Sequence, residues 1–387
     1  MKKLLLIICL ILCGCTDYAE LNNLSIVTAM SIDKDEDNYK LSVLIANSPK
    51  AQTTSKEGEA KTTVYEGTGK TIAEAIKVID KKSPKQLYFS HINVVIISKE
   101  IGKEGFLKTA DWLIRHPQTR DKFYLMQVDD DKASDILKII SPLESFPSQS
   151  IATLIESSQN AKSTGDTASY SNFIGRVLET GYEPMMYTIK INGDVKKGSK
   201  QSNLETAMPN TYLSLGPLAI YKNDKLIDTS TNKETETIQI INNEIKELIY
   251  KIKYKNNNIN IFSNNIKTNI DIENKSTIEI KVKAKGSIYE IDDYLNIREL
   301  KEINNLEKAW NKSIKKDIEK LINNLKYKYQ SDIFGFGNMI YKNYPDRWKQ
   351  IKNNWNEQFK DLNIKVKVNT KITSTGNLTK TLKEGES

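Results

Sequence analysis

Cysteine and histidine, which often supply nucleophiles and metal ligands, are scarce in this chain of 387 residues. The cysteines are Cys9, Cys13 and Cys15. Beyond position 15 the sequence therefore offers no thiolate nucleophile, no disulfide and no cysteine-ligated metal. His91 and His116 form no H-x-x-x-H or H-E-x-x-H pattern. His91 lies in the apolar run 87–97, which predicts a buried strand with a structural, hydrogen-bonded histidine. We predict no catalytic residue, no metal site and no cofactor.

The segment 67–71, Gly-Thr-Gly-Lys-Thr, follows a predicted strand and precedes a predicted helix, as a phosphate-binding loop does. The motif G-x-x-x-x-G-K-[ST] requires glycine at position 64, where this chain has Val64. Nucleotide binding is therefore not predicted. Thr71 and Glu74 instead have the spacing of a capping box at the start of a helix.

Two acidic clusters, 33–37 and 129–131, could suggest paired carboxylates or a calcium loop. Neither has the spacing D-x-[DN]-x-[DN]-G with glutamate at the twelfth position. Each cluster lies between a strand pattern and the next element, so we predict solvated turns.

Cys15 is the residue with a predicted covalent chemistry. It closes a leader in which two lysines precede the apolar run 4–12. This run is too short for a spanning helix of about 20 residues and suits a secretory signal. Residues 12–15, Leu-Cys-Gly-Cys, resemble the bacterial lipobox, whose cysteine accepts a diacylglyceryl group on sulfur before cleavage. An ordinary signal peptide would end in an A-x-A-like pattern, which this leader lacks. We expect 1–14 to be a lipoprotein signal peptide and Cys15, also acylated on nitrogen, to anchor the chain in membrane lipid.

The composition is that of a folded protein, with 27% charged and 39% hydrophobic residues. Its length predicts two or three domains. Loss of Lys2 and Lys3 with the leader lowers the net charge from +8 to +6. This modest excess is spread along the chain, so nucleic-acid binding is not predicted, while attraction to an anionic lipid surface is allowed.

Alternating strand and helix patterns predict a mixed α/β architecture in the first half. The runs 24–32 and 39–46 are expected to pair as antiparallel strands across the turn 33–38. Further strands are predicted at 62–66, near 94, and at 123–128 and 185–191, with helices at 71–79, 106–113, 133–140, 151–157 and 170–178. The segment 192–210 is rich in Gly, Ser, Lys and Asn and lacks periodicity. We therefore divide the chain into an N-terminal α/β region of two subdomains (15–195), a linker (196–210) and a C-terminal α/β domain (211–380).

The C-terminal domain combines short strands with one long helix. Strand patterns occur at 212–221, 248–254, 270–272 and 278–282. From about 297 to 330 apolar residues recur every three or four positions, which predicts an amphipathic helix about 50 Å long. A coiled coil with a partner is possible for this helix; packing across its own sheet is the expectation.

The segment after the long helix predicts an aromatic face. Pro345 suits a first helical position, and Trp348, Trp355 and Phe359 share one side of the helix that follows. We expect these side chains to bury against a sheet that ends with the strand 364–368. The alternative is an exposed face that docks a partner.

Three motifs in this region resemble the C-terminal hallmark of the Ger(x)C spore germination lipoproteins. They are 328–337 (Lys-Tyr-Gln-Ser-Asp-Ile-Phe-Gly-Phe-Gly), 344–349 (Tyr-Pro-Asp-Arg-Trp-Lys) and 355–359 (Trp-Asn-Glu-Gln-Phe). Near the anchor, Cys15-Thr16-Asp17 and Glu20-Leu21-Asn22 match the family except at Thr16, where tryptophan is usual. The family pattern is also matched by Gly69, Thr71, Glu74, Ala75, Ser90, His91, Asp111, Arg115, Arg120 and 216–222. Asp228 stands where the family commonly has glycine.

This resemblance implies a non-enzymatic lipoprotein subunit of a spore nutrient germinant receptor. It implies three α/β domains, each a sheet wrapped by helices, held by lipid on the outer face of the spore inner membrane. The implied partners are two membrane subunits, an A-type protein and a permease-like B-type protein. Two rival classes are a solute-binding lipoprotein, which needs a ligand cleft between domains, and a cell-envelope hydrolase, which needs a catalytic pair.

Overall fold

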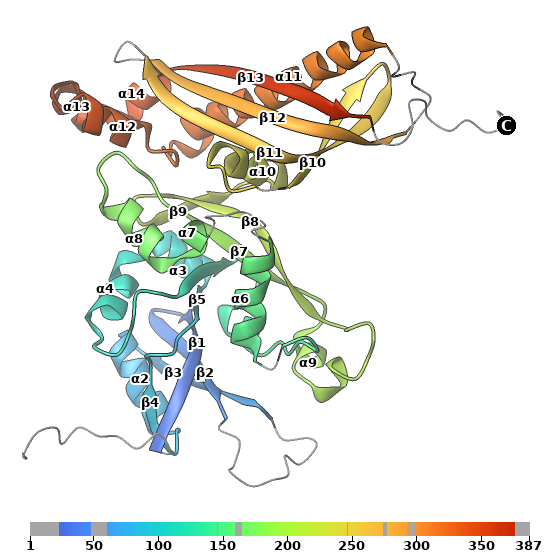
Figure 1. Cartoon of the computed structure of the whole chain (residues 1–387). Coiled ribbons are helices and arrows are strands. Elements are labelled where there is room, and N and C mark those ends of the chain that lie inside the picture. The colour runs from blue at the N-terminus through green and yellow to red at the C-terminus, as the bar shows by residue number, and fades with distance from the viewer. Residues whose placement is uncertain are drawn as a thin grey trace, which may run out of the picture.

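A computed structural model describes residues 23–47, 60–144, 146–158, 165–245, 247–273, 277–292, 295, 297 and 299–375. Their strands form two sheets, and each sheet is the centre of one unit (Figure 1). The unit that contains the first sheet is at the bottom of Figure 1, and the unit that contains the second is at the top. The predicted mixed architecture of sheets covered by helices is confirmed.

The first sheet is mixed, with the order β3-β2-β1-β5-β6-β7-β8-β9 and β4 paired with β1 outside this path. Its described strands are β1 (Leu24–Asp35), β2 (Asn38–Ala46), β3 (Thr62–Gly69), β4 (Gln86–Tyr88), β5 (Val94–Ile97), β6 (Tyr124–Val128), β7 (Met185–Asn192), β8 (Tyr212–Lys222) and β9 (Lys225–Thr229). Strand β1 is antiparallel to β2 and parallel to β5, as expected where helical connections follow a hairpin.

Helices cover both faces of the first sheet. One apolar cluster joins the sheet to α2 (Ile72–Asp80), α3 (Lys99–Glu104), α4 (Leu107–Arg115) and α8 (Tyr170–Leu178). The opposite face packs against α5 (Ala133–Ile136), α6 (Pro147–Ser158) and α7 (Gly165–Ala168). Because both faces are covered, the central strand β5 is buried at every position, which explains its unbroken apolar sequence.

The predicted hairpin of β1 and β2 is confirmed, although its turn is tighter than expected. Residues 33–35 continue β1, and the reversal occurs at Glu36, whose φ is 53°. The predicted strand 87–97 is wrong as a single element, because the chain forms β4, a turn and then β5. An apolar run of this kind predicts burial but not where the backbone bends.

The segment predicted as a linker, 196–210, contains ordered structure. It includes the end of α9 (Val195–Gly198) and η2 (Gln201–Asn203). The Asn203 side chain is fully buried; its Nδ2 donates to the carbonyls of Ile140 and Thr211, at 3.0 and 2.9 Å. Strands β7 and β8, on either side of this excursion, are hydrogen-bonded neighbours, so the first sheet continues across it. The domain boundaries themselves stay a prediction.

The second sheet has the order β10-β11-β12-β13. Its strands are β10 (Leu248–Tyr254), β11 (Asn257–Glu273), β12 (Thr277–Ile291) and β13 (Asn363–Ser374). The predicted long helix is confirmed as α11 (Leu300–Asn323), continued by the π-helical turn η3 (Asn324–Tyr329). It buries Leu306, Trp310 and Ile314 and packs against β10 and β13, as expected for a helix that covers its own sheet.

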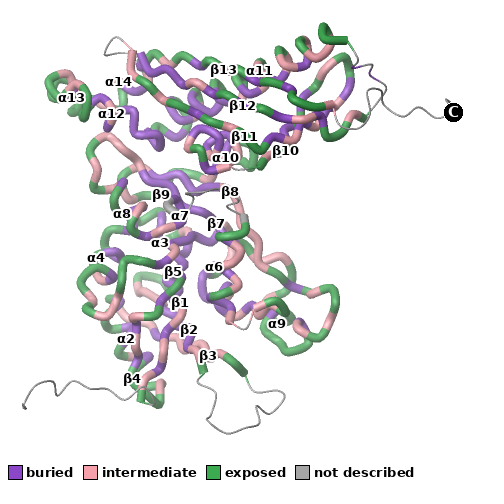
Figure 2. Tube along the Cα trace, in the orientation of Figure 1, coloured by how far each residue is buried: buried purple, intermediate pink, exposed green. Residues whose placement is uncertain are grey.

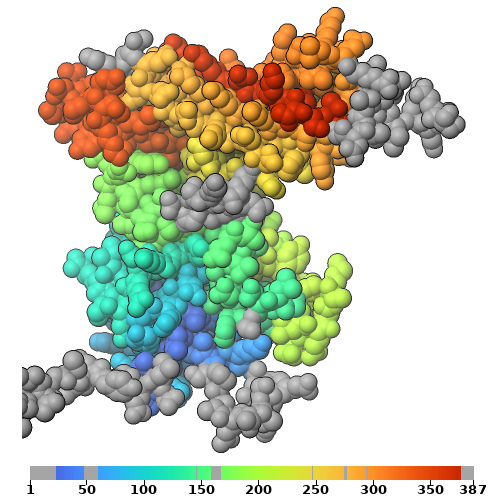
Figure 3. Space-filling view, viewed as in Figure 1, coloured from blue at the N-terminus to red at the C-terminus, as the bar shows by residue number. Residues whose placement is uncertain are grey.

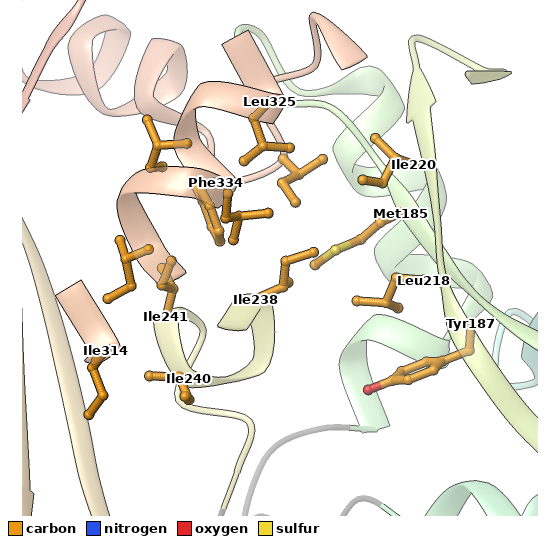
Figure 4. Packing of buried hydrophobic residues seen from close by; sticks show 14 of the residues in the cluster. Met185, Tyr187, Leu218, Ile220, Ile238, Ile240, Ile241, Ile314, Leu325 and Phe334 are labelled. Atoms are coloured by element: carbon orange, nitrogen blue, oxygen red, sulfur yellow. The ribbon is translucent and has the colours of Figure 1, made fainter. Parts of the chain in front are cut away.

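Helix α10 (Asn232–Ile241) joins the two units. Its Ile238 lies beside Met185 and Leu218 of the first sheet, and its Ile241 lies toward Phe334 (Figure 4). One apolar cluster therefore runs from the first sheet through α10 to α11. Figure 2 shows the buried residues continuing through β8, β9 and α10, where the units meet.

The chain between η3 and β13 forms four short helical elements. They are α12 (Phe336–Asn343), α13 (Pro345–Ile351), η4 (Lys352–Asn354) and α14 (Trp355–Asp361). Pro345 occupies the first position of α13, as predicted.

Candidate functional site

The segment 67–71 is built for close packing. Gly67 and Gly69 belong to β3; a Cβ atom there would lie 2.3 and 2.6 Å from backbone atoms of Ala75. Thr71 caps α2, because its hydroxyl oxygen accepts the N–H of Glu74 at 3.2 Å. The Glu74 carboxylate accepts the N–H of Lys70 at 2.9 Å rather than that of Thr71, so only the Thr71 half of the predicted capping box forms.

Among the described residues, neither histidine belongs to a group of side chains that could hold a metal ion, and no such group is found. The prediction that His91 lies in a buried strand is wrong, since it is exposed in the turn between β4 and β5. His116 follows α4 and packs its ring 4.7 Å from that of Trp112 and 5.0 Å from that of Phe89. Burial lowers the pKa of His116, which favours the neutral ring.

Asp33, predicted to lie in a solvated turn, is instead buried. Its carboxylate accepts the backbone N–H groups of Ala133 and Ser134 at 2.8 and 2.9 Å. Burial raises its pKa, while these hydrogen bonds act in the opposite direction. Asp33 therefore ties β1 to the first turn of α5, where the unpaired N–H groups of a helix need acceptors.

The second acidic cluster also has structural partners. Asp131 accepts the N–H of Ile191 at 3.0 Å, and Asp130 pairs with Lys99 at 3.0 Å. These contacts connect the end of β6 to β7 and to α3. Both acidic clusters, which were predicted to be solvated turns, therefore contain carboxylates with structural partners.

The hallmark residues converge where the two units meet, and we call 179–184 together with 330–338 the junction. Asp332 is buried, and its carboxylate accepts the N–H groups of Phe336 and Gly337 at 3.0 and 2.8 Å. Its carbonyl accepts the N–H of Glu183 at 3.1 Å. Ser331 donates from its hydroxyl to the carbonyl of Tyr221 at 2.6 Å, which adds a contact to β8. The Asp332 side chain thus caps the N-terminus of α12, while the Asp332 carbonyl binds the first unit.

Two glycines allow the chains of the junction to approach closely. A Cβ atom on Gly181, whose φ is +70°, would lie 2.6 Å from the carbonyl carbon of Gly337. Asn338 secures the contact by donating from its backbone N–H to the Gly181 carbonyl at 2.8 Å. At this separation the structure requires glycine at position 181 for both space and backbone conformation.

Aromatic side chains cover the junction. Trp348 is buried beside Gly181, and Trp355 is half-buried beside Gly337, with 5.3 Å between the two indole centroids. Phe334 and Phe336 are buried, as predicted for residues that fill the turn after the long helix. The prediction placed the tryptophans against the second sheet, whereas the structure places them over the contact between the units.

Two carboxyl groups at the junction have raised pKa values. Burial raises the pKa of Asp332 to about 7, against the effect of its backbone hydrogen bonds. Burial also raises the pKa of Glu183 to about 7, although the backbone N–H of Asn223 and the charge of Lys222 act in the opposite direction. The carboxylate of Glu183 accepts the N–H of Asn223 in the turn between β8 and β9. Protonation of these groups therefore favours the folded junction.

A second polar contact fastens α10 to the end of α11. The carboxylate of Glu234 accepts hydrogen bonds from Thr231 N–H at 2.7 Å, Asn324 Nδ2 at 2.7 Å and Tyr329 OH at 3.1 Å. Burial alone would raise the pKa of Glu234, but these donors lower it, so the group is an anion at neutral pH.

An apolar groove of about 420 Å³ lies on the first unit, between the segment 139–144, α6 and the start of β8. Leu143 and Tyr212 line it with exposed side chains, and Glu144 supplies a carboxylate. A groove of this size suits an apolar group of a ligand or partner. It does not have the position that the solute-binding alternative requires, because it belongs to one unit.

Sequence reasoning identified Asp332, Gly337, Trp348 and Trp355 as parts of a motif, but not the contact they make. Gly181, Glu183 and Asn338 were missed. Local patterns contain no signal that brings 179–184 next to 330–338, since that contact depends on how the two units pack.

Comparison with known proteins agrees with the motifs. Residues 17–191 match the family described as spore germination protein N-terminal domain. Residues 217–376 match the family described as spore germination B3/GerAC like, C-terminal. Spore germination protein KC of Bacillus subtilis (strain 168) is 27% identical over an alignment covering 96% of this chain and 95% of that protein. Spore germination protein B3 of the same strain is 25% identical, with 96% of each chain covered.

The fold has a counterpart among solved structures. The crystal structure of the GerBC protein matches with a TM-score of 0.54 and 19% identity, and covers 92% of this chain and 100% of that one. At this identity the match shows the fold alone. Two family models that together span most of the sequence, and relatives similar over nearly their whole length, show that the chain belongs to the Ger(x)C family of spore germination proteins.

Proposed function

We propose that this chain is a non-enzymatic, lipid-anchored subunit of a spore nutrient germinant receptor. The observation that carries the proposal is the family match, which begins at residue 17, two positions after Cys15, and extends to residue 376. A role in spore germination follows from the family and its relatives. The assignment to a germinant receptor goes further than the family match. The junction supports it, because the hallmark residues serve to fasten the two units together, which is a structural role.

The anchor would be Cys15, which lies outside the described residues. Strand β1 begins at Leu24, nine positions later, so the intervening chain reaches at most about 30 Å. A diacylglyceryl group supplies two acyl chains, which anchor stably where one chain gives only marginal membrane binding. None of the helices in the described part of the chain is both long and apolar enough to cross a membrane.

The proposed location is the outer face of the spore inner membrane, and the proposed partners are the A-type and B-type receptor subunits. The test is co-purification of the partners with this chain from detergent-solubilised spore membranes, in spores carrying either the natural chain or Cys15→Ser. The natural chain should sediment with membranes and retain both partners. The serine variant should remain unprocessed or be released, and germination in response to nutrients should fall. Normal processing and membrane binding of the variant would contradict the anchor, and absence of both partners from the purified natural chain would contradict the receptor assignment.

A further inference from the structure

The second sheet has one covered face and one open face. Helix α11 passes behind the sheet in Figure 1, so the other face points toward the viewer. Side chains alternate along each strand: in β12, Val282 and Ala284 are buried, whereas Lys283 and Lys285 between and beyond them are exposed. Figure 3 shows this open face across the upper unit.

Strand register arranges the exposed side chains of the open face in rows. Three adjacent rows contain only lysine and asparagine: Asn265–Lys285–Lys371, Lys267–Lys283–Asn369 and Asn269–Lys281–Lys367. The next row, Asp271–Glu279–Lys365, contains two acids, of which Glu279 is buried. We call the nine residues of the lysine and asparagine rows the lysine face.

The lysine face places like charges directly opposite each other. Lys267 is paired in register with Lys283, and Lys285 with Lys371. Lys281 and Lys367 are compensated, since both pair with Glu279. Among the described residues no ion pair involves the other four lysines. Like charges opposite one another on neighbouring strands destabilise a sheet, so folding does not account for this arrangement.

Apolar side chains border the lysine face at one end. Phe262 of β11 and Tyr289 of β12 have ring centroids 6.2 Å apart, and Tyr289 is 66% exposed. Ile249, which is paired in register with Phe262, is also exposed. A flat basic surface edged by aromatic and aliphatic groups matches the interface of a bilayer, where charged headgroups lie beside acyl chains.

We propose that the lysine face binds the anionic phospholipid headgroups of a bilayer. The proposal rests on the proposed function, in which Cys15 holds the chain at a membrane. The charged residues of this face are all lysines, which are mobile point charges; directional recognition of protein carboxylates favours arginine. Lysine is also depleted in protein–protein interfaces, whereas clusters of lysine are typical of peripheral contacts with anionic lipid. Lipid is therefore favoured over an acidic protein partner.

The test uses the chain from residue 16 onward, which keeps every described residue and removes the acyl anchor. Its binding is measured by co-sedimentation with vesicles of phosphatidylcholine alone and with vesicles containing one-third phosphatidylglycerol. One variant combines Lys267→Gln, Lys283→Gln, Lys285→Gln and Lys371→Gln. The control combines Lys308→Gln, Lys312→Gln, Lys316→Gln and Lys320→Gln, which removes the same charge from exposed positions on α11.

The natural chain should prefer the anionic vesicles, and this preference should fall with added salt. Each lysine near an anionic surface contributes about fivefold in affinity, so loss of four lysines in full contact should cost about 600-fold. We expect the sheet variant to lose at least about tenfold, even where only some of the four reach headgroups. The α11 control should lose less than about threefold. Thermal unfolding should show the sheet variant at least as stable as the natural chain, because opposed like charges are removed.

Equal losses in the two variants, or no preference of the natural chain for anionic vesicles, would overturn the proposal. If that preference is absent and the sheet variant loses receptor subunits on co-purification from spores, the face binds protein instead. The vesicle measurement uses neither the anchor nor the receptor, so it can fail while the proposed function stands.

Discussion

The side-chain amide of Asn338 donates a 2.9 Å hydrogen bond to the backbone carbonyl of Thr180, which lies 158 positions earlier in the chain. The backbone N–H of the same residue binds the carbonyl of Gly181. One residue of the second unit, through its side chain and its backbone, thus satisfies two successive carbonyls of a loop in the first.

Asn338→Ala should therefore lower the stability of the whole chain. The change removes a part-buried hydrogen bond to the carbonyl of Thr180, an exposed residue, at a cost of about 0.5–1.5 kcal/mol. Urea unfolding of the chain from residue 16 onward measures the loss. Asn343→Ala is the matched control, because Asn343 binds only a local carbonyl at an exposed site. If the two variants unfold at the same urea concentration, Asn338 does not fasten the units.

Gly181→Ala should be more harmful, because the new methyl group would meet the backbone of Gly337 at 2.6 Å in a left-handed conformation. We expect a loss of about 2 kcal/mol or more. Gly175→Ala provides the contrast, since nothing lies within 4 Å of a Cβ atom at that position in α8. It should stabilise the helix by about 0.5–1 kcal/mol. If Gly181→Ala and the natural chain have the same urea midpoint of unfolding, the junction is not packed as tightly as the structure indicates.

Trp348→Ala should cost about 3–5 kcal/mol, as is usual for a large buried aromatic side chain. Trp355→Ala should cost less, because its indole is only half-buried. Tyr327→Ala, at a 63% exposed position, should have little effect. Thermal unfolding and the level of folded subunit in spores check this order. A Trp355→Ala chain that melts normally but loses the receptor subunits would show that its aromatic surface docks a partner.

Glu183→Gln should change how stability depends on pH. The pKa of Glu183 is raised to about 7 in the folded chain from the usual 4.5. The folded state therefore holds a proton that the unfolded state has lost between these values, and stability from this group falls as pH rises toward 7. As pH rises from 4.5 to 8, the free energy of unfolding of the glutamine variant should therefore increase by about 1–3 kcal/mol relative to that of the natural chain. An identical pH profile of urea midpoints for both chains would refute the shift. Asp332 remains in both chains and leaves a slope of the same sign.

Local sequence patterns predicted the elements that local physics determines. The β1–β2 hairpin, α8, the long helix through Trp310 and the start of α13 at Pro345 depend on periodicity, turns and caps. The helix predicted at 133–140 ends at Ile136 in α5. Its N-terminal acceptor, Asp33, lies 100 positions earlier in the chain, so local propensity could not reveal it. Long-range pairing was beyond these patterns. The excursion between the paired strands β7 and β8 is held by the buried amide of Asn203, which composition presented as a linker residue.

The candidate site was predicted in part for the same reason. The aromatic and glycine motif from 328 to 359 was recognised from its order. Its side chains Phe334, Phe336, Trp348 and Phe359 are buried, and Trp355 is half-buried. Their counterpart at Gly181 and Glu183 belongs to a loop with no motif of its own. A glycine that is needed for a distant contact looks the same in sequence as one that ends a helix.

The placement of α10 has a mechanical consequence. Proteins that close around a solute need two bodies separated by a surface that water can wet, so that opening costs little. Here opening would pull Ile238 away from Met185 and Leu218 and expose apolar area at about 25 cal/mol for each Å². The two units are therefore expected to move as one rigid body instead of closing around a solute. A force that displaces one unit would then displace the other with it.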